Sequence, residues 1–289
     1  MRFYILLFYF CREKIFMNVK IIQSRDNVNL NCAYRKISEG SPWIVLILPF
    51  GLPVDVSKHF FSYFNKRFNL LTWESRLVLC DEEYKMDNKY SISRHVSDMH
   101  CLIKEFNVKK SFVVGYCSGA GIALAFTNRH PNLVRNLVLV HGEYTFLDDK
   151  TCVTNFGLEM DFLLSLIAND KSQLGTVFNK IGNVIKAQSN SLRFINTPFT
   201  RKPYLERYAE NYVAYKLVNF EELAKFVYHK TLVLTGKMDK QTNINSSKKI
   251  HELMPNASIS IDEDADHYGI FYKESNTLAK VWNYLYSVN

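Results

Sequence analysis

The sequence predicts an α/β fold, in which an open and mostly parallel sheet carries helices on both faces. Short, continuous apolar runs alternate with amphipathic segments along most of the 289 residues, and turn residues separate them. Continuous apolar runs are typical of strands that are buried on both faces. The apolar residues make up 47% of the chain, which is enough for a sizeable core.

The first expected elements form an antiparallel edge of the sheet. Residues 18–23 and 28–36 alternate apolar and polar positions, and Asp26 and Asn27 supply a turn between them. Further strands are expected at 43–48, 69–73, 111–116, 136–141, 231–236 and 257–262. Helical periodicity predicts helices at 59–68, 91–106, 244–254 and 275–287, with another beginning directly after Cys117.

The pattern changes between residues 145 and 228, where helix-like segments follow one another without a buried strand run. We therefore expect a helical cap at 145–228, inserted into a core formed by 17–144 and 229–289. Residues 1–16 are interpreted as an upstream extension or a mis-called start, and a weak membrane-associating tail is the alternative. Because no apolar run reaches about 18 residues, no stable membrane span is expected.

Charge and cysteine usage exclude several classes of protein. The net charge is +8, from 36 basic and 28 acidic residues, but the basic residues are scattered, which argues against a dedicated nucleic-acid binder. The six cysteines show neither C-x-x-C pairs nor zinc-finger spacing, so we expect no metal site and a reduced, cytoplasmic chain. The glycines follow neither the phosphate-loop nor the dinucleotide pattern, and no cofactor is implied.

The strongest chemical signal is Gly115-Tyr116-Cys117-Ser118-Gly119, between an expected strand and an expected helix. A side chain at such a tight turn needs small neighbours two positions away on either side. This register puts Cys117, not Ser118, at the turn, where the helix N-terminus would favour a thiolate. The alternative is a buried packing cysteine.

The strand–G-x-C-x-G–helix arrangement resembles the nucleophile elbow of the α/β-hydrolase superfamily, over residues 18–145 and 229–288. Dienelactone hydrolases, polyester synthases and some acyltransferases and thioesterases of natural-product pathways use cysteine at this position. LTWESR at 71–76 is similar to the family's D-x-R-G segment, with Glu74 for Asp and Leu77 for Gly. Together with HGEYTF at 141–146, it is most similar to hydrolases encoded near acyl-carrier-protein pathways.

The resemblance implies an α/β-hydrolase fold and a catalytic triad in the family's chain order. Cys117 would be the nucleophile, His267 the base and Asp239 the acid that orients it. Glu143 is the alternative acid, because some members place the acid after the preceding strand.

The resemblance also implies an oxyanion hole, formed by the backbone N–H groups of Ser118 and Leu52. The loop that carries Leu52 has Phe50 where the family has histidine. His141, at the end of an expected strand, is interpreted as structural. The aromatic residues at 60–68 and 204–215 are interpreted as core or cap packing, and lining of an acyl pocket is the second possibility.

A cysteine nucleophile gives a thioester intermediate, which exchanges readily with thioesters and amines. We therefore expect a thioesterase or acyltransferase acting on acyl thioesters or activated esters. Its small acyl substrate would be carried on an anionic acyl carrier protein or coenzyme A. The alternatives are an esterase or lactonase of the dienelactone-hydrolase type and a non-catalytic binding protein.

Overall fold

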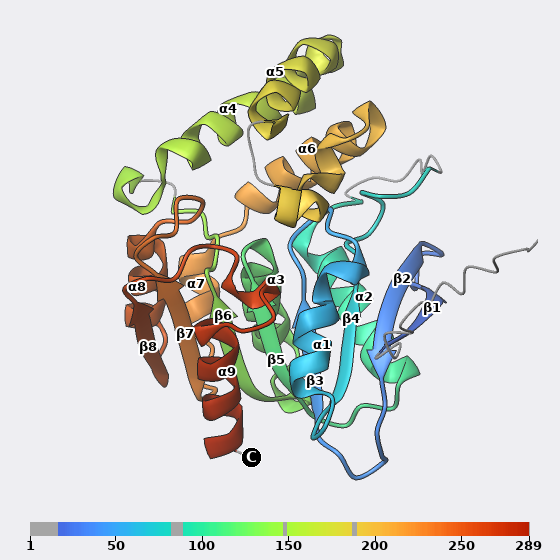
Figure 1. Cartoon of the computed structure of the whole chain (residues 1–289), viewed down its shortest axis with the longest axis vertical. Coiled ribbons are helices and arrows are strands. Elements are labelled where there is room, and N and C mark those ends of the chain that lie inside the picture. The colour runs from blue at the N-terminus through green and yellow to red at the C-terminus, as the bar shows by residue number, and fades with distance from the viewer. Residues whose placement is uncertain (1–16, 82–88, 147–148, 187–189, 289) are drawn as a thin grey trace, which may run out of the picture.

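The computed structural model describes residues 17–81, 89–146, 149–186 and 190–288. Their strands form one sheet in the order β1-β2-β4-β3-β5-β6-β7-β8 (Figure 1). The strands are β1 Asn18–Gln23, β2 Asn29–Arg35, β3 Trp43–Ile47, β4 Asn69–Trp73, β5 Ser111–Tyr116, β6 Val134–Val140, β7 Thr231–Gly236 and β8 Ala257–Asp262.

Six of the strands run parallel. Strands β1 and β2 form an antiparallel hairpin, and β2 pairs antiparallel with β4. Each neighbouring pair along the rest of the sheet, in the order β4-β3-β5-β6-β7-β8, is parallel. The central strands β3, β4 and β5 are buried along their whole length. The predicted fold class, with its antiparallel edge, is therefore confirmed.

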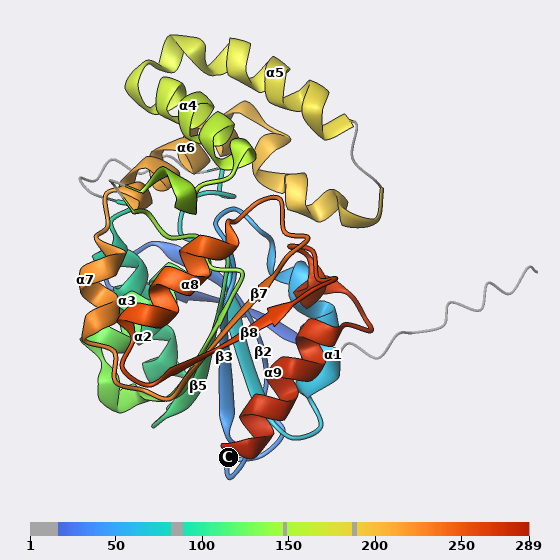
Figure 2. The same cartoon turned by 90° about the vertical axis from the view of Figure 1, so that its left-hand side faces the viewer.

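Helices cover both faces of the sheet (Figures 1 and 2). Successive strand residues point to opposite faces, so that Val45 and Ile47 join one hydrophobic core and Ile44 and Leu46 join the other. The first face carries α2 Ile92–Glu105, α3 Ser118–Arg129, α7 Phe220–Lys225 and α8 Ile244–Leu253; the second carries α1 Lys58–Phe64 and α9 Asn276–Ser287.

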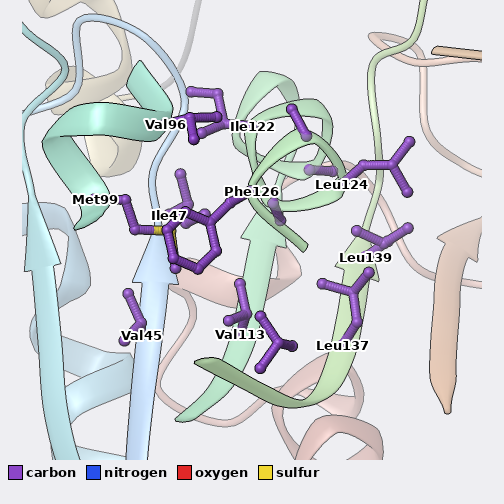
Figure 3. Packing of buried hydrophobic residues seen from close by; sticks show 14 of the residues in the cluster. Val45, Ile47, Val96, Met99, Val113, Ile122, Leu124, Phe126, Leu137 and Leu139 are labelled. Atoms are coloured by element: carbon purple, nitrogen blue, oxygen red, sulfur yellow. The ribbon is translucent and has the colours of Figure 1, made fainter. Parts of the chain in front are cut away.

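Figure 3 shows how tightly the first face is packed. Phe126 of α3 lies among strand residues from β3 and β5, with Met99 of α2 beside it. α2 presents one apolar stripe, whereas α3 is buried on nearly all sides from Ser118 to Thr127, and this packing fixes the start of α3 at the end of β5.

Three longer helices lie beyond the carboxyl ends of the parallel strands (Figures 1 and 2). These cap helices are α4 Asn155–Asn169, α5 Leu174–Lys186 and α6 Lys202–Lys216. They share a small core of their own, which includes Leu164, Ile167, Val177 and Leu205. The described part of 145–228 contains no strand, because its apolar residues recur at helical rather than alternating spacing.

None of the helices in the described ranges is both long and apolar enough to span a bilayer.

Candidate active site

The chain turns sharply at Cys117, between β5 and α3. Cys117 adopts φ 53° and ψ −124°, a conformation that side chains other than glycine rarely take. A Cβ at Gly119 would lie 2.3 Å from the carbonyl oxygen of Ile47, and one at Gly115 would lie 2.6 Å from the Cα of Ala120. Backbone crowding thus explains why glycine occupies both positions around the cysteine.

The Cys117 thiol is half-buried and lies against an acid. Its Sγ donates to Oε2 of Glu143 at 3.8 Å. Burial and the Glu143 carboxylate raise the pKa of Cys117 well above its ordinary value, and the Ser118 N–H opposes them in part. The resting thiol is therefore protonated.

Asp239 follows β7 and orients His267, which follows β8. The Nδ1 of His267 lies 2.8 Å from Oδ2 of Asp239. Because a carboxylate only accepts, His267 carries its proton on Nδ1 and leaves Nε2 free to accept another. The hydroxyl of Tyr116 donates to the backbone oxygen of His267 at 2.6 Å and fixes the loop.

A second imidazole shares the same carboxylate oxygen. His141, fully buried after β6 and at φ 47°, donates its Nδ1–H to Oδ2 of Asp239 at 2.8 Å. Thr242 donates its hydroxyl to that oxygen as well, at 2.7 Å. Burial works to raise the pKa of Asp239, but the two imidazoles outweigh it and hold that pKa well below its ordinary value. Asp239 is therefore a permanent carboxylate near neutral pH.

His141 shows what the sequence interpretation did not specify. The sequence interpretation gave it a structural role, and the structure adds that its hydrogen bond goes to Asp239, the acid expected to serve the site. Burial lowers the pKa of His141, so its imidazole is neutral near pH 7. Its position at the carboxyl end of a buried strand was the one signal in the sequence, because loops at those ends converge in a parallel sheet.

The loop after β3 faces the elbow. The N–H of Leu52 donates to Pro49 O at 3.5 Å, a long bond that leaves it available to a stronger acceptor. Phe50 N–H donates to Ser118 Oγ at 3.2 Å, which ties the loop to the start of α3. The two expected oxyanion donors, Ser118 and Leu52, thus stand on segments that are joined to each other.

The TWESR segment, residues 72–76, accepts hydrogen bonds from the loop that carries Leu52. Ser75 Oγ accepts from Gly51 N–H at 2.8 Å, and Glu74 Oε1 accepts from Val54 N–H at 3.0 Å. The fully buried Arg76 pairs with Asp26 at 2.6 Å and anchors the segment to the β1–β2 turn. The resemblance noted in this segment therefore corresponds to a structural role beside the site.

A cavity of about 150 Å³ lies between the elbow and the cap helices. Cys117, Glu143 and His267 line its floor, and the thiol's hydrogen bond is to Glu143 rather than to the imidazole. Its other walls are mostly apolar and include Phe50, Phe156, Met160, Leu163, Tyr208, Tyr212 and Phe271. Two aromatic residues of the 204–215 segment thus line the cavity, whereas the phenylalanines of 60–68 pack in the core.

His141, Asp239 and His267 bring potential metal-ligand atoms within 4.8 Å of one another. Both imidazoles direct Nδ1 at one carboxylate oxygen at hydrogen-bond distance. A proton on each nitrogen accounts for this arrangement fully, so these residues fit a hydrogen-bonded acid better than a metal centre.

Comparison with known proteins agrees with this architecture. The family model described as "alpha/beta hydrolase fold" matches residues 54–176. An L-allo-isoleucyltransferase of Pseudomonas savastanoi pv. glycinea is 25% identical over 240 residues, which cover 78% of this chain and 80% of the relative. A 2-hydroxymuconate semialdehyde hydrolase of Pseudomonas putida is 24% identical over 198 residues, covering 64% and 66% of the two chains.

The fold also matches solved structures. The enol-lactonase from Burkholderia xenovorans LB400 has a TM-score of 0.73 at 16% identity, over 92% of this chain and all of that one (100%). The relatives are hydrolases and an acyltransferase, consistent with either activity here. The structural matches show that the chain has the α/β-hydrolase fold, and the family model, which matches residues 54–176, supports its place in the α/β-hydrolase superfamily.

Proposed function

We propose that this protein is an acyltransferase or thioesterase that carries its acyl group on Cys117. The observation that carries this proposal is the cysteine at the strained elbow, on the same cavity as an imidazole held by a carboxylate. Sulfur is both a good nucleophile and a good leaving group, so the acyl-enzyme is a reactive thioester.

The chemistry follows from the protonation states. Nε2 of His267 takes the Cys117 proton, and the thiolate attacks the carbonyl carbon of an incoming thioester. The N–H groups of Ser118 and Leu52 face the negative charge that develops on the carbonyl oxygen. The departing thiol then receives the proton from His267, which leaves an acyl group on Sγ for an acceptor thiol, amine or water.

Transfer is favoured over hydrolysis for two reasons. A thioester intermediate loses little free energy when a second thiol attacks it, so exchange between carriers is efficient. The relative that matches 78% of this chain is named as a transferase, whereas the one named as a hydrolase matches 64%. The net charge of +8 suits an anionic carrier, such as an acyl carrier protein or coenzyme A, in the cytoplasm.

The proposal is tested by mass spectrometry of the intact protein after incubation with acyl N-acetylcysteamine thioesters. We expect a covalent acyl adduct on Cys117 that is absent from Cys117→Ala. An added thiol or amine should release the acyl group faster than water does; release to water alone would instead favour the esterase or lactonase alternative. Equal turnover by Cys117→Ala would overturn the proposal.

A further inference from the structure

Glu143 places a negative charge directly beside the nucleophile. Its Oε2 lies 3.8 Å from Cys117 Sγ, and its backbone is held on both sides. The Glu143 N–H donates to the carbonyl of Cys117 at 3.2 Å, and its own carbonyl accepts from Tyr215 at 2.6 Å. The position of this carboxylate is therefore built into the fold.

Among the described residues, Glu143 forms no ion pair, and neither lysine nor arginine lines the cavity that contains Cys117. Lys216 shares a smaller neighbouring pocket with Glu143, but it is paired with Asp161 at 3.2 Å. The other acid of the cavity, Glu159, is paired with Lys180 at 3.1 Å. A carboxylate that receives only a weak thiol hydrogen bond from the described side chains is unfavourable among mostly apolar walls, unless a ligand supplies a stronger donor or a positive charge.

Glu143 also opposes the reaction in the empty site. Together with burial, its charge favours the neutral thiol over the thiolate that must attack. A substrate that brings a cation next to Glu143 removes this penalty when it binds. An uncharged acyl chain leaves the penalty in place.

Covalent geometry identifies which cation fits. In a thioester of an α-amino acid, the ammonium nitrogen lies roughly 3–4 Å from the thioester sulfur. The carboxylate lies 3.8 Å from the same sulfur position, on Cys117. The nitrogen and the oxygen can therefore meet at the roughly 2.8 Å of a charge-assisted hydrogen bond.

We infer that Glu143 is a binding site for the α-ammonium group, and that the preferred acyl groups are aminoacyl groups with an apolar side chain. The apolar wall, formed by residues such as Met160, Leu163 and Phe271, would take that side chain. This inference rests on the proposed acylation of Cys117 and adds the class of acyl group to it.

The test compares two probes that differ in one group, L-leucyl- and 4-methylpentanoyl-N-acetylcysteamine. Acylation rates of Cys117 are measured by mass spectrometry and divided by each probe's rate with free glutathione, which removes the intrinsic difference in reactivity. We expect the wild-type protein to prefer the leucyl probe by roughly ten- to a hundredfold, as a charged hydrogen bond allows.

Glu143→Gln should reduce this preference to near unity, because the amide keeps the shape but not the charge. It should also speed the 4-methylpentanoyl reaction, since the thiolate is no longer opposed. Glu159→Gln is the matched control and should keep the wild-type ratio, because Lys180 already neutralises Glu159.

The outcomes separate the two proposals. Equal rates for both probes in the wild type, or an unchanged ratio in Glu143→Gln, would overturn the ammonium site while leaving acyl transfer intact. A general-base role of Glu143 would slow both probes alike and give that unchanged ratio. An absence of any Cys117 adduct from either probe would remove the proposed function and this inference with it.

Discussion

Replacement of Asp239 by asparagine tests the acid–imidazole pair most directly. Five donors converge on this carboxylate: both imidazoles and the Thr242 hydroxyl on Oδ2, and the N–H groups of Gln241 and Thr242 on Oδ1. An amide can accept on only one side. The backbone donors cannot move, so the NH₂ group of the introduced asparagine must face the imidazoles.

This arrangement forces His267 into the wrong tautomer. Nδ1 must then accept, the proton moves to Nε2, and the imidazole can no longer take the thiol proton. Loss of the orienting carboxylate costs a serine protease about ten-thousandfold. We expect about a thousandfold to ten-thousandfold slower acylation of Cys117 in Asp239→Asn, or about 4 to 5 kcal/mol in activation free energy.

The same change also costs stability. His141 is fully buried, and its Nε2 has no hydrogen-bond partner among the described residues. Moving its proton to Nε2 would bury an unpaired donor, which costs about 1–3 kcal/mol. Urea unfolding should therefore show a lower midpoint with an unchanged slope.

The assay is single-turnover acylation by an N-acetylcysteamine thioester, followed by intact mass. Asp264→Asn is the control, because it removes the same charge from the His267 loop but leaves the Asp239 hydrogen bonds in place. A rate for Asp239→Asn within tenfold of the wild type would refute the assignment of the acid. If Glu143 were the orienting acid instead, Glu143→Gln would show the slow acylation that is expected here of Asp239→Asn.

Three further predictions concern the elbow and the acid. Gly119→Ala should lower the free energy of unfolding by about 1–3 kcal/mol, since its Cβ would lie 2.3 Å from a fixed backbone oxygen; an unchanged urea midpoint would contradict this. Cys117→Gly should abolish the acyl adduct yet raise the melting temperature, because glycine relieves about 1–3 kcal/mol of strain at φ 53°. Because folding lowers the pKa of Asp239, its carboxylate contributes fully to stability above the unfolded pKa of 3.8, and this contribution is progressively lost as the pH falls below that value. In a plot of urea midpoint against pH, Asp239→Asn should therefore lose less stability in acid than the wild type. Curves for the two proteins that fall in parallel would argue against this linkage.

The order and type of the elements could be predicted from the sequence because each has a local signature. Runs such as SFVVGY are mostly apolar, as a strand covered on both faces requires, and β5 spans that same run and is buried at every position. The cap helices repeat apolar residues at helical spacing. Gly115 and Gly119 identified the elbow cysteine, because the crowding they relieve arises within the strand–turn–helix unit and its nearest strand.

The contacts around the candidate site required the tertiary structure. His141 and Asp239 are 98 positions apart in the chain, and their meeting depends on β6 and β7 being neighbours in the sheet. The sequence placed Glu143 near the site as an alternative acid, but its contact with the thiol depends on the path of the loop after β6. Local periodicity specifies which residues are buried, whereas the direction of a loop side chain is set by the elements packed around it.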